Sequence, residues 1–303
     1  MTLTDQVIKN IVSRVIKSQD YRIEVVNLIN AEFLQFAVDF FKKVVEAKLN
    51  SKDITIEWYK NAFMSNKLTS EEIAINSGLN KKTISNMYRS ATRQIVIEAS
   101  SEHFNSLYGS IQALVENENE IDLTLTVKLK GVSVDLNVSE SLIVINTLAV
   151  KRAAIRGGLW STAGKRAEKY LMLALCKLYE VPEANYNSDH FIKNKELDVD
   201  REIDFYLMSN GTEYKCEVKL MGQGNPESAD AIIARDSAVF VADTLSQQNK
   251  NQCDQLGVNW IACRDEDGFK RFKLALEKLE IPHKNYNGNL EEDLPAILEE
   301  LFR

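Results

Sequence analysis

Two carboxylates and one ammonium lie close together in the stretch 202-EIDFYLMSNGTEYKCEVKL-220, where two runs of alternating residues surround a Ser-Asn-Gly turn. This pattern predicts a β-hairpin. Asp204 begins the first run, and Glu217 and Lys219 lie two residues apart on the second, so the latter pair projects from one face of its strand. Two carboxylates in close contact repel each other unless a cation lies between them, and Mg²⁺ prefers such oxygen ligands. The hairpin therefore predicts a magnesium site at Asp204 and Glu217, with Lys219 beside the water that attacks a phosphodiester.

The spacing of these residues, D-x12-E-x-K, resembles the active-site motif of the PD-(D/E)XK nucleases, which include many type II restriction endonucleases and several repair nucleases. Ile203 stands where the motif usually has proline, a change that leaves the proposed ligands intact. The resemblance covers about residues 160–265 and implies a catalytic core of the order α-β-β-β-α-β. A salt-bridged hairpin on the surface is the alternative interpretation of the three residues taken alone.

A further carboxylate lies upstream, in 164-GKRAEKYLMLALCKL-178. The helical period of this segment places Glu168 on its otherwise apolar stripe, where a core residue is expected. Nucleases of this superfamily often carry a glutamate on the helix before the hairpin. The resemblance therefore implies that Glu168 is a catalytic residue, either an outer metal ligand or a residue that orients the site.

The stretch after the lysine, 222-GQGNPESADAIIARDSAVFVADTL-245, begins with a strong helix start at Asn225-Pro226. The N-terminus of this helix should point toward bound DNA, and its polar side chains are suited to reading bases. These candidate base-reading residues are Asn225, Glu227, Ser228, Asp230, Arg235 and Asp236. A solvated helix is the alternative. Together with 160-WSTAGKRAEK-169, the stretch looks similar to restriction enzymes of the CfrBI type, which implies a short palindromic target in double-stranded DNA and a homodimer.

Basic residues gather in 151-KRAAIRGGLWSTAGKRAEK-169, which has six basic side chains and one acidic side chain. Such a stretch at the entrance to the catalytic half is suited to phosphate contacts, with Lys165 and Arg166 as candidates. A basic linker held by a buried Trp160 is an equally good interpretation.

The segment 68-LTSEEIAINSGLNKKTISNMYRS-90 has the spacing of a helix-turn-helix. Ala74 allows close helix contact, Gly78 suits the left-handed turn, and Ile84 and Met87 are expected to face the core. Short polar and basic side chains would then lie on the exposed face of the second helix, where they can contact bases and phosphates. They are Lys81, Lys82, Thr83, Ser85, Asn86 and Arg89. A tight helical hairpin with a solvated face is the alternative.

These sites require two different kinds of scaffold. Apolar residues at helical steps in 6–18 and 32–49 predict a helical domain at 1–150, and the alternating segment 121–138 adds a short β element to it. Beyond a boundary near 140–155, strands alternate with helices, which predicts an α/β (α+β) catalytic domain at 151–303. We expect its mixed central sheet to be flanked by helices.

Composition limits the classes of function. The chain has 303 residues, with 37 basic and 44 acidic side chains, so any binding of nucleic acid must depend on local clusters. The four cysteines lack CxxC spacing and there are only three histidines, which argues against zinc and favours reduced, buried thiols. The absence of a long apolar segment predicts a cytoplasmic protein without a membrane partner.

The leading interpretation is a Mg²⁺-dependent type II restriction endonuclease. A repair or junction-resolving nuclease of the same fold is the nearest alternative. A different class of protein, a helix-turn-helix regulator with an inactive nuclease-like half, would leave the intact set of two carboxylates and a lysine unexplained.

Overall fold

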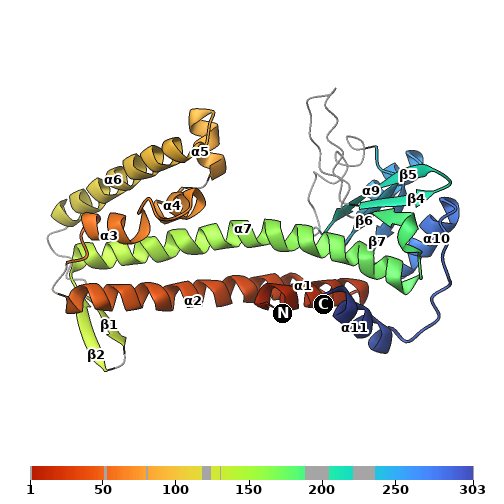
Figure 1. Cartoon of the computed structure of the whole chain (residues 1–303), viewed down its shortest axis with the longest axis horizontal. Coiled ribbons are helices and arrows are strands. Elements are labelled where there is room, and N and C mark those ends of the chain that lie inside the picture. The colour runs from red at the N-terminus through yellow and green to blue at the C-terminus, as the bar shows by residue number, and fades with distance from the viewer. Residues whose placement is uncertain are drawn as a thin grey trace. The chain divides into compact units, whose positions relative to one another are not determined.

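The computed structural model describes residues 2–50, 53–79, 81–117, 124–129, 131–187, 205–220 and 236–302. Contacts divide the chain into two compact units (Figure 1). Met1–Leu28 and Leu159–Arg303 form what we call the sheet unit, and Ile29–Gly158 form the helical unit. The expected domains, 1–150 and 151–303, remain a prediction, and the contacts group residues 1–28 with the sheet unit.

The sheet unit contains a five-stranded sheet of order β3-β4-β5-β6-β7. The strands are β3 (Tyr186–Asn187), β4 (Phe205–Ser209), β5 (Thr212–Lys219), β6 (Val239–Ala242) and β7 (Asn259–Ala262). β3, β4 and β5 pair antiparallel, whereas β5, β6 and β7 pair parallel. β6 is buried along its whole length, as expected for a central parallel strand covered on both faces. The mixed sheet predicted from the sequence is confirmed.

The predicted hairpin is also confirmed over the described residues. β4 and β5 are joined by Asn210 and Gly211, both with positive φ, which suits a tight turn between twisted strands. Phe205 pairs with Cys216 at the open end of the hairpin. The hairpin thus brings the end of β5 beside the start of β4.

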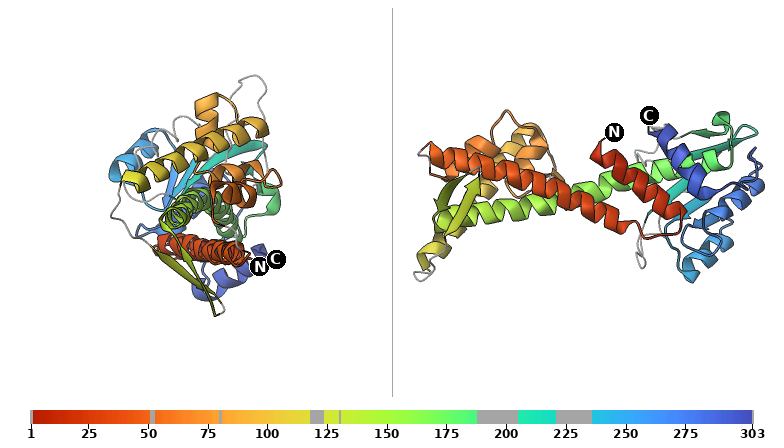
Figure 2. Two further views of the ribbon diagram at one scale, coloured as in Figure 1. Left: turned by 90° about the vertical axis from the view of Figure 1, so that its left-hand side faces the viewer. Right: turned by 90° about the horizontal axis from the view of Figure 1, so that it is seen from below.

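Several helices accompany the sheet in the described part of this unit. They are α1 (Leu3–Ile16), α9 (Gln247–Gln255), α10 (Arg271–Lys278), α11 (Leu290–Leu301) and the short 3₁₀ turns Glu183–Asn185 and Gly268–Lys270. The start of α2 (Arg22–Leu49) and the end of α7 (Val138–Leu178) also belong to this unit. α1 lies beside α11 (Figure 2). Ion pairs join Lys9 to Glu299 and Lys17 to Glu291. These contacts hold the N-terminal helix in the unit that carries the sheet.

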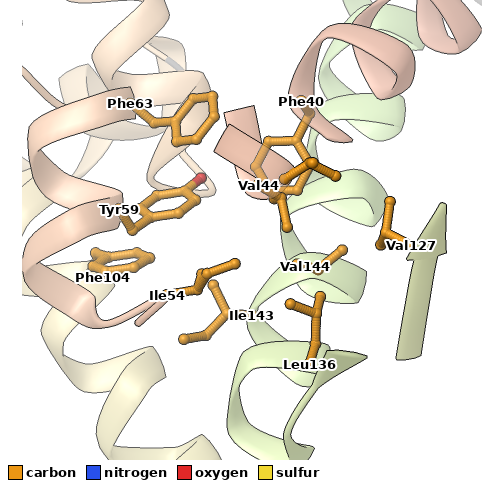
Figure 3. Packing of buried hydrophobic residues seen from close by; sticks show 11 residues of the cluster. Phe40, Val44, Ile54, Tyr59, Phe63, Phe104, Val127, Leu136, Ile143 and Val144 are labelled. Carbon is orange, nitrogen blue, oxygen red and sulfur yellow. The ribbon is translucent and has the colours of Figure 1, made fainter. Parts of the chain in front are cut away.

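Within the described residues, the helical unit comprises the rest of α2 and α7 with four further helices and a β-hairpin. These are α3 (Ile56–Phe63), α4 (Ser70–Asn76), α5 (Lys81–Tyr88), α6 (Arg93–Asn117), β1 (Leu125–Leu129) and β2 (Val132–Leu136). Its core packs Phe40 and Phe63 near the stacked rings of Tyr59 and Phe104, whose centroids are 4.5 Å apart (Figure 3). α1 and α2 cover most of the helices predicted at 6–18 and 32–49, and over the described residues β1 and β2 lie within the β element expected at 121–138. Residues 140–155, where we expected the domain boundary, are helical.

Two short helices, α4 and α5, lie where the sequence predicts a helix-turn-helix. Thr69 caps α4, Gly78 adopts φ +92° in the connection, and Ala74 and Ile84 are fully buried. The expectation for Met87 is wrong, because its side chain is 61% exposed. The cluster around Ala74 and Ile84 is completed by Val96 and Ala99 of α6, with Leu79, Ala91 and Ile95 beside them, and Met87 lies outside it. None of the helices that the structure describes is both long and apolar enough to span a membrane.

Candidate active site

Glu217 and Lys219 lie together near the C-terminal end of β5, as the period of the strand predicts. Their Cα positions pair with Phe240 and Ala242 of the parallel strand β6. The Glu217 side chain is buried, and its Oε1 lies 2.7 Å from the Lys219 Nζ. Lys219 also donates a 3.2 Å hydrogen bond to the carbonyl of Val218, and its side chain remains 25% exposed. The lysine therefore links a buried carboxylate to the surface at the end of the strand.

The first proposed ligand, Asp204, lies outside the described residues. Phe205, which follows it in the chain, begins β4 and pairs with Cys216, next to Glu217. The described residues contain no group of three or more His, Cys, Asp or Glu side chains that would form a metal site. The proposed magnesium site, which depends on Asp204, thus stays a prediction.

Glu168 of α7 approaches the same end of β5. Its side chain is largely buried, and its Oε1 accepts a 3.1 Å hydrogen bond from the main-chain N–H of Leu220. Leu220 directly follows Lys219, so Glu168 contacts the peptide next to the lysine. This position fits a residue that orients the site.

Tyr21, which the sequence did not single out, contacts the other main-chain group of the same residue, Leu220. Its hydroxyl donates a 2.8 Å hydrogen bond to the carbonyl oxygen of Leu220. Burial raises the pKa of Tyr21 well above its usual range, and the nearby carboxylates of Asp243 and Glu168 add to this effect. The Tyr21 hydroxyl is therefore a hydrogen-bond donor at neutral pH. A tyrosine between two predicted helices carries no local signal of such a role.

Asp243 and Arg264 form a second feature that sequence reasoning missed. Asp243 directly follows β6, is fully buried and lies 2.8 Å from Arg264 Nη2. Burial raises the pKa of Asp243, although Arg264 opposes this change. Within the described part of the chain, Asp243 Oδ1 and Arg264 Nε lack hydrogen-bond partners. The sequence does carry a signal for Asp243, because this residue follows the apolar run 239–242. Polar residues at the C-terminal ends of parallel strands often belong to ligand-binding or active sites.

Some of the expected DNA contacts fall in the sheet unit. Arg166 forms a 2.6 Å ion pair with Asp5, so a phosphate would have to share or replace that partner. Lys165 is exposed on the same helix. Asp236 is exposed and lies 4.0 Å from Lys215 Nζ. The other candidate base-reading residues, Asn225, Glu227, Ser228, Asp230 and Arg235, lie outside the described residues.

The remaining expected DNA contacts lie on α5 of the helical unit, except Arg89, which directly follows this helix. Ser85, Asn86 and Arg89 are exposed, whereas Thr83 is half-buried. Lys81 and Lys82 form the start of α5, but their side chains are outside the described part. The described polar side chains of α5 thus offer neutral hydrogen-bonding groups, and Arg89 adds one guanidinium just beyond its end.

The cysteine thiols are poor candidates for nucleophiles. All four cysteines are free and buried, and burial raises the pKa of each thiol. The chemistry available at the end of β5 is instead that of carboxylates and an ammonium, which suits charge stabilisation and activation of water.

Comparison with known proteins identifies a related family. Residues 5–250 match the family model described as CfrBI restriction endonuclease. The match covers most of both units, including Tyr21, Glu168, Glu217, Lys219 and Asp243. Neither the comparison with curated proteins nor that with solved structures found a match.

Proposed function

The chain belongs to the CfrBI restriction endonuclease family, and we propose that it uses Mg²⁺ to cleave a short specific site in double-stranded DNA. The observation that carries this proposal is the buried Glu217 carboxylate paired with Lys219 at the end of β5, next to the peptide that Glu168 contacts. Burying a carboxylate costs several kcal/mol unless charged or hydrogen-bonding partners compensate it. A site for chemistry on a phosphate explains why the protein keeps this group.

The donor set fits a hard divalent cation. We propose that Glu217 and Asp204 hold Mg²⁺, because carboxylate oxygens are the ligands that this ion prefers. When bound, Mg²⁺ supplies positive charge to the phosphate oxygens and the leaving group. Lys219 would orient the attacking water and donate to the phosphate as negative charge develops on it. Its bonds to Glu217 and Val218 restrict the ammonium to the end of the strand.

The target would be recognised by two parts of the chain. We propose that residues 225–236 read bases beside the scissile phosphate, with Lys165 and Arg166 on the DNA backbone. We also propose that α4 and α5 act as a helix-turn-helix. The buried Ala74 and Ile84, the positive φ of Gly78 and the exposed face of α5 support this role.

The assembly would follow from the target. A palindromic site presents the same bases on both strands, so a twofold homodimer would cut both strands with equivalent active sites. We propose that this dimer acts on foreign DNA in the cytoplasm. Sedimentation of the chain with and without a cleavable duplex would test the dimer directly.

A plasmid digest tests the proposed function. The purified chain with Mg²⁺ should give discrete fragments, whereas a repair nuclease would give smears or nicks at unusual structures. A regulator would bind DNA without cutting it. Lys219→Ala should abolish cleavage, and Lys273→Ala is its control, because Lys273 lies on α10 of the sheet unit and pairs with Glu277. Equal activity of the two variants would contradict the proposed role of Lys219.

A further inference from the structure

The loop between α1 and α2, residues 17–21, contacts the ends of the parallel strands. Tyr21 OH donates to the carbonyl of Leu220 at 2.8 Å, directly after β5. Ser18 Oγ donates to the carbonyl of Cys263 at 2.8 Å, directly after β7. Between them, Arg264 contacts Asp243 at the end of β6 and lies 3.9 Å from Asp20. Because β5, β6 and β7 run parallel, these contacts all lie at the C-terminal ends of the three strands, where Lys219 also lies.

Both main-chain groups of Leu220 are held by side chains from distant parts of the chain. Its N–H donates to Glu168 at 3.1 Å, and its carbonyl accepts from Tyr21 at 2.8 Å. The described part of β4 begins at Phe205, opposite Cys216, so Leu220 lies beyond the described pairing of these strands. Side chains thus provide hydrogen bonds that a neighbouring strand provides elsewhere along β5.

We propose that Tyr21 is a positioning residue that fixes Leu220, the residue after Lys219, through its carbonyl and thereby places the lysine ammonium for cleavage. This inference rests on the proposed function of Lys219. Lys219 Nζ is held by Glu217 and by the carbonyl of Val218, and the Lys219 carbonyl accepts from the N–H of Asp243 at 3.4 Å, but none of these bonds holds the main chain of Leu220. A catalytic group displaced by about 1 Å can lose on the order of a hundredfold in rate. Holding both main-chain groups of Leu220, the residue that follows the lysine, opposes such a displacement.

The chemistry of Tyr21 suits a residue that acts as a hydrogen-bond donor. Burial, assisted by the carboxylates of Asp243 and Glu168, raises the pKa of Tyr21, so the phenol keeps its proton throughout the neutral range. Its single donor is directed to the Leu220 carbonyl. Tyr21 therefore acts through Leu220 and does not need to contact the DNA.

The test compares Tyr21→Phe with Ser18→Ala in the full chain. Each substitution removes one hydroxyl of the same loop, and each hydroxyl bonds to a main-chain carbonyl at 2.8 Å, but only that of Tyr21 contacts the residue after Lys219. The substrate is a duplex oligonucleotide that contains a site cut by the wild-type chain. Measurements are the single-turnover cleavage rate at saturating DNA, the Kd for that duplex with Ca²⁺, and the thermal midpoint.

We expect Tyr21→Phe to lower the cleavage rate about tenfold, the effect of one lost hydrogen bond, and to leave the Kd within about twofold. Ser18→Ala should cleave at close to the wild-type rate, although both variants lower the thermal midpoint. A wild-type rate for Tyr21→Phe would overturn the proposal. An equal loss of rate in both variants would also overturn it, because it would indicate general loosening of the loop. A weaker affinity for the duplex at an unchanged cleavage rate would overturn it as well.

Lys219→Ala, measured beside them, separates this proposal from the proposed function. If Lys219→Ala cleaves like the wild type, the role of Lys219 is wrong and the inference about Tyr21 falls with it. If Lys219→Ala is inactive while Tyr21→Phe is unaffected, only the positioning role is wrong.

Discussion

Glu168 of α7 accepts a 3.1 Å hydrogen bond from the main-chain N–H of Leu220, the residue that follows Lys219 on β5. This bond connects a helix carboxylate to the strand that carries the proposed catalytic lysine. Near an active site, a carboxylate can accept a hydrogen bond or bind Mg²⁺. A hydrogen-bond acceptor need not be charged, whereas a ligand for Mg²⁺ works best as an anion.

Replacing Glu168 by glutamine or alanine distinguishes these functions. Glutamine keeps an oxygen that can accept from Leu220, whereas alanine removes it. If Glu168 orients the strand, Glu168→Ala should lower the single-turnover rate by roughly 10- to 100-fold, and Glu168→Gln should stay within about tenfold of the wild type. Glu180→Gln, which changes an exposed glutamate paired with Lys284, is the control. Equal losses in the glutamine and alanine variants would show that the negative charge is what matters.

The proposed metal ligands predict that binding and cleavage respond differently to substitution. Asp204→Ala should remove Mg²⁺ and nearly all cleavage, yet leave DNA affinity intact or improved, because one carboxylate fewer repels the phosphates. Ca²⁺ should support DNA binding by the unaltered chain without cleavage, since it is a larger ion with looser coordination. Gel-shift affinity and plasmid cleavage, each with Mg²⁺ and with Ca²⁺, provide the measurements. Cleavage by Asp204→Ala at near the wild-type rate would disprove the proposed site.

The elements of the sheet unit were largely predictable because each has a local signal. The alternating runs around Asn210-Gly211 predicted the hairpin, and the stripe of residues 164–178 predicted that Glu168 is buried on a helix. The pairing of Glu217 with Lys219 follows from the two-residue period of a strand. These features depend only on residues that are neighbours in the sequence.

Other features depend on contacts between distant residues, and local patterns could not predict them. Tyr21 and Leu220 are 199 residues apart in the chain, and the placement of α1 with the sheet unit depends on its contacts with α11. For Met87, a local pattern gave a wrong prediction. It has an apolar side chain at a helical step from Ile84, but Leu79, Ala91 and Ile95 complete the cluster, which leaves Met87 exposed.

Gly78 provides a stability test of the α4–α5 connection. Its φ is +92°, and an added Cβ would lie 3.1 Å from His103 Nε2. Gly131 is the matched control, because its φ is +84° but no atom lies within 4 Å of an added Cβ. Gly131→Ala should lower the free energy of unfolding by about 1–2 kcal/mol through backbone strain alone, and Gly78→Ala should lower it by more. Urea titration of both variants provides the measurement.

A double-mutant cycle identifies the cause of that extra loss. If contact with His103 is responsible, adding His103→Ala to Gly78→Ala should recover part of the free energy of unfolding, and the two substitutions should not be additive. Additive effects would mean that the backbone conformation of Gly78 accounts for the whole loss.

The exposed face of α5 predicts a change in the salt dependence of DNA binding. Arg89 is exposed at the end of this face, and a phosphate contact by its guanidinium would release counterions from DNA. Arg89→Ala should therefore weaken binding and reduce the slope of log K against log salt by about 0.9. Lys128→Ala is the control, because it removes one exposed positive charge from β1 of the same unit and should leave the slope unchanged.

Asn86→Ala, which removes no charge, should change the preferred sequence and not the slope, since amide side chains read base edges. Binding is measured with Ca²⁺ over a series of salt concentrations, on duplexes with and without the cleavage site. Identical slopes for Arg89→Ala and Lys128→Ala would contradict a DNA-binding role for α5.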